Sequence, residues 1–404
     1  MSAGETPVPV HGQVRATGIV AAGMMGMNVL TYVFSLLCAR LLGPSDFGAL
    51  SALLGLMIVA NVGALALQAT AARRLATTSS EYRDAVTQDV IRSGWRVALI
   101  LGAVLLAAAP LVDHLLHLDD WVVACAPAFV VAPLALMGAY AGVLQGGRHW
   151  GSLALVYASM GGGRVVAGFG ALLIDPSLPS AMIGLAVGAL APAVVGAALC
   201  HVDHTRTLHQ DHEPVARELW TNGHTLLAFF AFINLDVLLA RYHLDEREAG
   251  IYAAGAILAK ACLFLPTFIL VVAFPTMAAE RGGRPWLKPL LGVGALGLLA
   301  VLGAAVLPDL AVAFAGGAAY ADLGDVAWLF AVEGTMFAGL QILVYDTIAG
   351  QSHSGLLLWL GAVLVLVVAL LVVDSVLSLV ALVTLVALGV GLVTSLMPGA
   401  THPD

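Results

Sequence analysis

The sequence predicts an all-α integral membrane protein with about twelve transmembrane helices in two pseudo-symmetric lobes of six. Of its 404 residues, 60% are hydrophobic and only 10% are charged, whereas an average soluble domain has about 25% charged residues. Long apolar runs alternate with short polar stretches, which leave no room for a sizeable soluble domain. The sequence has no basic stripe, so nucleic-acid binding has no support.

Charged and turn residues divide the chain into apolar runs, each about long enough to cross a bilayer as one helix. The runs of the first half are 16–39, 47–72, 95–112, 121–145, 151–174 and 179–201. The runs of the second half are 219–241, 249–279, 289–308, 324–349, 355–373 and 375–397. The eighth run is long and contains Pro266 and Pro275, which predict a kink, a tilt or an extension beyond the membrane.

These runs predict a simple domain order. A tail (1–15) precedes an N-terminal lobe (16–201), a His-rich linker (202–218), a C-terminal lobe (219–397) and a second tail (398–404). Basic residues favour one side of the membrane by roughly four to one, so the positive-inside rule predicts cytoplasmic N- and C-termini.

Two polar segments have alternative interpretations. The segment 73–96 carries Tyr82, Val86 and Val90 at four-residue spacing, which predicts either an amphipathic helix along the inner interface or a solvated connector. The histidines of the linker are able to ligate a metal if that segment is helical. Because a flexible polar linker explains them as well, we predict neither a metal site nor a cofactor. The four cysteines stand singly and are read as small apolar residues.

Two short motifs recur at a spacing of about half the chain. The stretch Arg40 to Gly48 is similar to Arg241 to Gly250, and the turn Gln145 to Gly151 is similar to Gly350 to Gly355. Such a repeat predicts two lobes of the same orientation, related by an axis along the membrane normal, with a cavity between them. The alternative is that short glycine-containing turns between apolar helices look alike without any repeat.

The same stretches resemble a known family. Ala39 to Leu50 resembles the first hairpin of polysaccharide flippases of the multidrug/oligosaccharidyl-lipid/polysaccharide (MOP) superfamily, and Ala249 to Ala254 resembles the start of that family's eighth span. With the turn at Gln145 to Gly151 and the twelve-span layout, the resemblance covers most of the chain. It implies two six-helix bundles that face each other in a V and rock between inward-open and outward-open states. It also implies a lipid-linked cargo, without naming the sugar.

Charges inside apolar runs are the candidate functional residues, because a charge at the centre of a membrane helix costs roughly 2.5–3.5 kcal/mol on insertion scales. Arg164 lies in the fifth run and Lys260 in the eighth, at a similar predicted depth. We expect both to bind the phosphates of a polyprenyl diphosphate-linked saccharide. The alternative for each is a carboxylate partner that neutralises it and locks the bundle.

Asp236 in the seventh run and Glu333 in the tenth are candidate ion-coupling groups, since a carboxylate in apolar surroundings can exchange a proton or bind a cation. A simple ion pair with Lys260 is the alternative. Arg40 and Arg241, at repeat-related helix ends, are possible gate residues. Snorkelling and capping of their own helices is the interpretation that the sequence favours for these two arginines.

The predicted function is a flippase that translocates a polyprenyl diphosphate-linked oligosaccharide across the bacterial cytoplasmic membrane by alternating access, for cell-surface polysaccharide biosynthesis. A drug or small-metabolite exporter of the same superfamily is the alternative. A membrane glycosyltransferase or polymerase is disfavoured because its chemistry usually needs a large extramembrane loop, and Asp119–Asp120 is the best acidic pair available. We therefore predict no enzymatic activity. The expected partners are the lipid-linked saccharide, membrane lipid, glycosyltransferases and a polysaccharide polymerase.

Overall fold

The computed structural model describes residues 10–79, 81–200, 215–264, 286–349 and 355–396, and within these ranges the chain is helical and contains no strand. The first half consists of α1 (Val10–Ala60), α2 (Val62–Thr77), α3 (Arg83–Leu116), α4 (Trp121–Gly146), α5 (Trp150–Gly163), the π-helix η1 (Arg164–Phe169), α6 (Gly170–Ile174) and α7 (Leu178–Leu199). The second half consists of α8 (Val215–His243), α9 (Glu246–Phe264), α11 (Leu287–Val306), α12 (Pro308–Ala315), the 3-10 helix η2 (Ala318–Asp325), α13 (Ala327–Ala349), α14 (Gly355–Val372) and α15 (Val376–Leu396).

The helices confirm the predicted membrane fold. Within the described ranges, 10 segments are long and apolar enough to cross a membrane. One of them, Gly18–Ala76, covers the second predicted span and all but the first two residues of the first. Helix α9 is the start of the predicted eighth span, and the rest of that run, with its two prolines, lies outside the described residues. The other predicted spans match helices in chain order.

The chain reverses direction inside α1. Gly43 has φ 74° and ψ 173° and is followed by Pro44, and only glycine adopts such a backbone at little cost. The segment before it (10–42) is the first arm of α1, and the segment after it (44–60) is the second arm. Gly23 packs against Ala154, and the later Ala72 packs against Gly146. Both neighbours lie around the α4–α5 turn, so the chain returns to the end from which it started.

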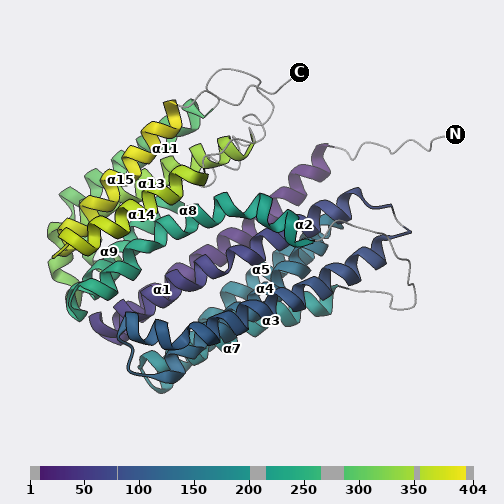
Figure 1. Cartoon of the computed structure of the whole chain (residues 1–404), viewed down its shortest axis with the longest axis horizontal. Coiled ribbons are helices and arrows are strands. Elements are labelled where there is room, and N and C mark those ends of the chain that lie inside the picture. The colour runs from purple at the N-terminus through teal and green to yellow at the C-terminus, as the bar shows by residue number, and fades with distance from the viewer. Residues whose placement is uncertain (1–9, 80, 201–214, 265–285, 350–354, 397–404) are drawn as a thin grey trace.

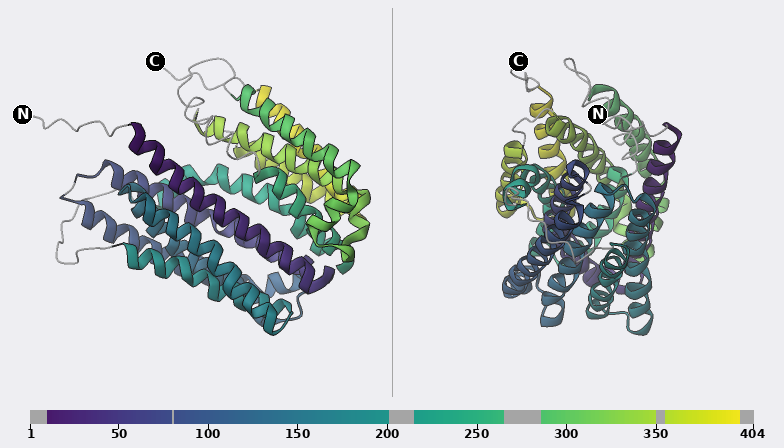
Figure 2. Two further views of the ribbon diagram at one scale, coloured as in Figure 1. Left: turned by 180° about the vertical axis from the view of Figure 1, so that it is seen from behind. Right: turned by 90° about the vertical axis from the view of Figure 1, so that its right-hand side faces the viewer.

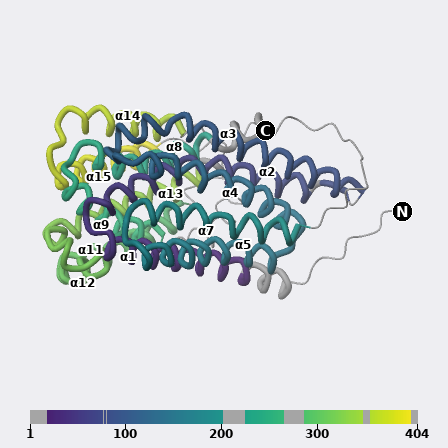
Figure 3. Tube along the Cα trace, turned by 90° about the horizontal axis from the view of Figure 1, so that it is seen from below, coloured from purple at the N-terminus to yellow at the C-terminus, as the bar shows by residue number. Residues whose placement is uncertain are grey.

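The helices form two bundles. In the N-lobe (α1–α7), α4 packs against α2, α3 and α7, and α5 packs against α1 and α7. In the C-lobe (α8–α15), α13 packs against α9, α11 and α15, and α14 packs against α8. Figures 1 and 2 show the two bundles separating toward the chain termini. Figure 3 shows α9 and α12 at the opposite end, which we call the distal end.

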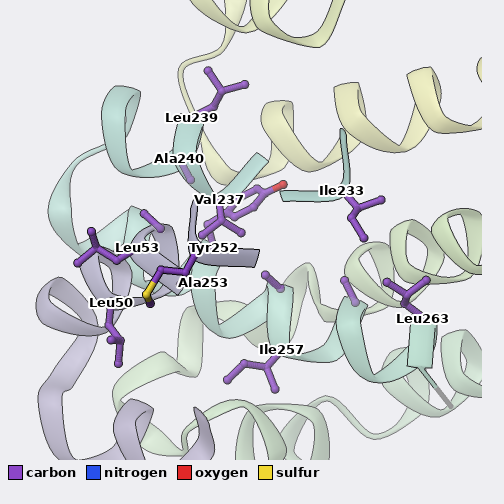
Figure 4. Packing of buried hydrophobic residues seen from close by; sticks show 14 of the residues in the cluster. Leu50, Leu53, Ile233, Val237, Leu239, Ala240, Tyr252, Ala253, Ile257 and Leu263 are labelled. Carbon is purple, nitrogen blue, oxygen red and sulfur yellow. The ribbon is translucent and has the colours of Figure 1, made fainter. Parts of the chain in front are cut away.

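The lobes meet along α1, which packs against α8 and α9, while α2 packs against α8. Figure 4 shows Leu50 and Leu53 of α1 facing apolar side chains of α8 and α9. Lipid tails are as apolar as such side chains, so close packing and hydrogen bonds hold membrane helices together. Leu50 and Leu53 are fully buried, and a side chain added at Gly48 would meet the backbone nitrogen of Gly250 at 3.0 Å.

A hydrogen bond at the same contact agrees with the two-fold relation that the sequence repeat predicts. Ser45 Oγ donates to Glu246 Oε2 at 2.7 Å, and these two residues are 201 positions apart, the offset that relates Arg40 to Arg241. Equivalent residues touch each other only where a two-fold axis passes between them. The second arm of α1 and the first turn of α9 therefore lie on the pseudo-symmetry axis.

Two predicted connections are different in the structure. Helix α3 begins at Arg83, so the second half of the segment 73–96 continues the third span and is neither a separate interfacial helix nor a solvated connector. The reason is burial: Val86 and Val90 pack against Leu67 of α2 and Ala139 of α4. The expected connection after the ninth span is also ordered, as α12 and η2.

Some predicted segments lie outside the described residues. These are most of the N-terminal tail (1–9), most of the His-rich linker (201–214) and the C-terminal end (397–404). The placement of the termini on the cytoplasmic side stays a prediction.

Candidate functional site

Arg164 is positioned by a local change of helix type in the N-lobe. The α-helical α5 ends at Gly163, and a π-helical stretch begins at Arg164, a feature that is frequent at functional sites. Gly163 packs directly on Gly188 of α7, where a side chain would collide with the backbone. The π-helix therefore lies close against α7 and carries a partly exposed Arg164.

The surroundings of Arg164 contain no acidic partner. Its Nη1 donates to Thr31 Oγ1 of α1 at 3.4 Å, and the buried Cys38 thiol lies nearby. Among the described residues, no carboxylate forms an ion pair with this guanidinium. The interpretation of Arg164 as a cation neutralised by a carboxylate thus finds no support in the described part of the chain.

Lys260 lies in a cluster of charged groups in the C-lobe. Asp236 of α8 and Glu333 of α13 are 2% and 0% exposed, and Lys260 of α9 interacts electrostatically with both. Lys260 itself remains partly exposed. Buried charges are stable in proteins when opposite charges and hydrogen bonds compensate them. The alternative of an acidic partner therefore describes Lys260, but not Arg164.

Tyr252 connects the two buried acids. Its hydroxyl lies 3.3 Å from Asp236 Oδ2 and 3.3 Å from Glu333 Oε1. The remaining oxygens, Asp236 Oδ1 and Glu333 Oε2, have no hydrogen-bond partner among the described residues. Figure 4 shows the Tyr252 ring at the lobe contact, surrounded by apolar side chains. Asp236, Tyr252, Lys260 and Glu333 are called the C-lobe cluster below.

The hydrogen-bond inventory of the C-lobe cluster has a chemical consequence. A tyrosine hydroxyl has one hydrogen to donate, and an ionised carboxylate only accepts. Both contacts of Tyr252 can be hydrogen bonds at once only if either Asp236 or Glu333 carries a proton. With that proton and the charge of Lys260, the cluster is neutral; without it, the cluster carries one net negative charge. The site can therefore hold one exchangeable proton.

Arg40 and Arg241 make contacts that the sequence does not predict. Arg40 Nη2 of α1 donates to the carbonyl of Ala313 in α12 at 3.2 Å. Arg241 of α8 donates through Nε to the carbonyl of Leu116 at 2.8 Å and through Nη2 to that of His117 at 3.1 Å. The expectation that each arginine caps its own helix is wrong, because each reaches a helix end in the opposite lobe.

The structure thus groups the predicted residues in three places. Asp236, Glu333 and Lys260 come together in the C-lobe, Arg164 lies apart from them in the N-lobe, and the two outer arginines lie at the distal end. Sequence reasoning missed Tyr252, although it stands in the family-like stretch at Ala249 to Ala254. A tyrosine in an apolar helix is a weak signal until the helices that face it are known.

One member of the acidic pair considered for an enzyme has a structural role. Asp120 is the N-cap of α4, and its side chain accepts hydrogen bonds from the backbone nitrogens of Val122 and Val123 at 2.8 and 3.4 Å. Such a cap satisfies donors that the first turn of a helix leaves free.

Comparison with known proteins agrees with this architecture. A family model described as "Polysaccharide biosynthesis protein" matches residues 14–279. An inward-facing multidrug resistance MATE family transporter of the MOP superfamily is 12% identical, with a TM-score of 0.74 over 94% of this chain and 96% of that one. The outward-facing conformation of such a transporter gives a TM-score of 0.59 at 12% identity and 94% coverage of both chains. A search of curated proteins found no match.

Two further solved structures extend the likeness. A MOP superfamily transporter from Pyrococcus furiosus is 12% identical and gives a TM-score of 0.62 over 94% of both chains. A eukaryotic MATE transporter is 13% identical and gives a TM-score of 0.61 over 96% of both chains. At such identities the likeness shows the fold alone, which is the fold of these MATE and MOP superfamily structures. The chain therefore has the multi-pass helical fold of these transporters and belongs to the polysaccharide biosynthesis protein family.

Proposed function

We propose that this transporter is a flippase for a polyprenyl diphosphate-linked oligosaccharide. The observation that carries the proposal is Arg164: a partly exposed cation within a membrane span, without an acidic partner among the described residues. A charge in that position costs free energy of membrane insertion, and such charges are found mainly where they are functional. The match to a family of polysaccharide biosynthesis supports an anionic lipid-linked cargo for this cation.

The chemistry of Arg164 suits a diphosphate. Its planar guanidinium presents parallel donors that match two phosphate oxygens, and such charge-assisted bonds are about twice as strong as neutral ones. The headgroup must leave water to cross the membrane, and a fixed cation offsets part of that desolvation. Asp236 and Glu333 compensate the charge of Lys260, so in this proposal the attraction of the diphosphate rests on Arg164.

The C-lobe cluster is the proposed coupling site. Loss of its proton leaves two buried acids with one compensating lysine, and a buried uncompensated charge is strongly unfavourable. Proton uptake and release thereby favour different packings of α8, α9 and α13, which carry Asp236, Tyr252 and Glu333. In this scheme the proton gradient drives the lobes between their two states.

The proposed setting follows from this cargo. The protein works in the bacterial cytoplasmic membrane with both termini in the cytoplasm. Glycosyltransferases supply its lipid-linked substrate, and a polymerase consumes the translocated product.

A drug or small-metabolite exporter is the second candidate, because structures with the same fold are those of multidrug resistance transporters. Cationic drugs are a poor fit to Arg164, because like charges repel at close range.

Reconstitution into proteoliposomes tests the proposal. A fluorescent polyprenyl diphosphate-linked monosaccharide in the inner leaflet becomes accessible to an added membrane-impermeant quencher only after flipping. We expect the wild-type protein to accelerate this process and Arg164→Ala to abolish the acceleration. Arg92→Ala is the matched control, because Arg92 is exposed and pairs with Asp89 three residues away. No acceleration by wild-type protein, together with uptake of a cationic dye, would favour the exporter.

A further inference from the structure

The distal end of the molecule holds a reciprocal pair of contacts between the lobes. The last turn of every helix leaves backbone carbonyls without a partner in the helix, and these carbonyls form the negative end of the helix dipole. Two helices end at the distal end near the opposite lobe: α3 of the N-lobe at Leu116 and α12 of the C-lobe at Ala315.

Arg241 caps the end of α3 from the other lobe. His117, directly after α3, adopts a left-handed conformation with φ 49°, so the chain turns away and exposes its last carbonyls. The guanidinium of Arg241 donates hydrogen bonds to two of these carbonyls, those of Leu116 and His117. Arg241 is only 6% exposed, and the ring of its neighbour Tyr242 stacks on the ring of His117.

Arg40 caps the end of α12 in the same way. It donates to the carbonyl of Ala313, and the Tyr32 hydroxyl donates to that of Phe314 at 3.0 Å. In the reverse direction, the hydroxyl of Tyr320 in η2 donates to the carbonyl of Ala39 at 2.8 Å. The first arm of α1 is thus tied to α12 and η2 of the C-lobe.

The two arginines are equivalent by the internal repeat. They are separated by the same 201 positions as Ser45 and Glu246, which touch each other on the pseudo-symmetry axis. A two-fold axis requires that if one lobe contributes an arginine to the other, the other contributes one in return. The reciprocal caps satisfy this requirement.

We propose that the contacts of Arg40 and Arg241 with the opposite lobe form a latch that closes the distal end. Both contacts open each time the transporter changes state. The acceptors in the opposite lobe are neutral backbone carbonyls, while the ion pair of Arg241 with Glu246, at 3.9 Å, stays within the C-lobe. Such bonds are weaker than those of an arginine with a buried carboxylate, which suits a contact that must break in every cycle. The latch concerns the conformational change and does not depend on the identity of the cargo.

Another distal arginine provides the matched control. Arg247 pairs with Asp322 at 2.8 Å, and both side chains are more than half exposed. Both residues belong to the C-lobe, so their ion pair does not cross between the lobes.

Distance measurements by pulsed electron paramagnetic resonance test the latch. Spin labels go on exposed distal positions in each lobe, Pro176 and Ala321, in purified full-length protein whose four native cysteines are replaced. We expect the wild type to show one dominant short distance. Removal of either arginine contact, by Arg40→Ala or Arg241→Ala, should raise the ratio of open to closed molecules about tenfold. Arg247→Ala should leave the distribution unchanged.

Two results would overturn the latch. One is a distance distribution that stays as in the wild type when both arginines are replaced by alanine in protein that remains monodisperse. The other is an equal shift in Arg247→Ala. If the double variant does not fold, Arg40→Ala alone decides, because Arg40 is exposed. The measurement needs no substrate, so failure of the flippase proposal and failure of the latch give different results.

Discussion

The surroundings of the two membrane-embedded cations differ between the lobes. Arg164 in the N-lobe contacts a threonine hydroxyl and lies near a buried thiol, while Lys260 in the C-lobe stands with two buried acids and a tyrosine. The N-lobe region therefore has a net positive charge, and the C-lobe cluster is neutral or negative according to its proton. In the proposed function, this difference assigns attraction of an anionic headgroup to the N-lobe and exchange of a coupling ion to the C-lobe.

The largest expected effect tests the compensation of charge in the C-lobe. Lys260→Met leaves Asp236 and Glu333 without their cation, and breaking a buried charge group in this way costs about 3–5 kcal/mol. The thermal unfolding temperature of purified protein in detergent measures the loss. We expect a second change, Glu333→Gln, to recover much of it, because one negative charge is then removed as well.

Lys288→Met is the control for this experiment, since the side chain of Lys288 is exposed at the start of α11. An equal loss of stability in both lysine variants would contradict the view that Lys260 is held by the acids.

The second effect tests the uncompensated cation. Arg164→Ala removes a charge-assisted bond to the diphosphate of about 2 kcal/mol, which corresponds to roughly 30-fold weaker binding. Titration of the protein with a soluble short-chain prenyl diphosphate measures the affinity. Because no acidic partner of Arg164 is left behind in the described structure, we expect its unfolding temperature to change little. A large loss of stability with unaltered affinity would assign Arg164 to packing.

A smaller effect tests the tyrosine between the acids. Tyr252→Phe keeps the buried ring and removes only the hydroxyl, so we expect a loss of about 1–2 kcal/mol of stability. We also expect the dependence of transport on an imposed proton gradient to weaken, because the hydroxyl that links the two acids is lost. Tyr242→Phe serves as the control, since Tyr242 is 42% exposed and stacks on His117 through its ring. Unchanged gradient dependence in Tyr252→Phe would exclude a role of this hydroxyl in proton coupling.

The smallest effect compares the buried acids with a surface one. Hydrogen bonds from Ser177 and Ser180 lower the pKa of Asp175 from its ordinary value of 3.8. Since the folded state favours the ionised form, the stabilisation is complete above that ordinary value and disappears as the pH falls through the lower, folded value. Asp175→Asn should therefore remove a small part of the acid sensitivity of unfolding below about pH 4. An unchanged acid limb of the unfolding temperature against pH would contradict this.

Much of the architecture follows from the sequence because membrane helices have simple requirements. Each span needs about 20 apolar residues, so runs such as 355–373 and 375–397 nearly coincide with α14 and α15. The segment 73–96 shows where this reasoning fails. Its charges suggest solvent, whereas Val86 and Val90 extend a packed face of α3 beyond the apolar run.

The residues of the candidate site could be predicted from the sequence, but the contacts between them could not. The cost of membrane charges singles out Asp236, Lys260 and Glu333, but nothing local shows that α8, α9 and α13 bring them together around Tyr252. The sequence correctly predicts that the outer arginines cap helix ends. The predicted helix ends were wrong, because tertiary packing decides whether an arginine reaches a carbonyl of its own helix or one of the opposite lobe.

The contact between Ser45 and Glu246 has a further consequence for how such a chain can arise. Where a symmetry axis passes between two identical halves, a residue faces its own copy: two serines are tolerated there, but two glutamates repel each other. Here one side donates a hydrogen bond and the other accepts it, a pairing that is available only to halves of unequal sequence. Fusion of the halves into one chain thus allows each side of the axis to specialise, and the division of charge between the lobes is the same freedom applied within the membrane.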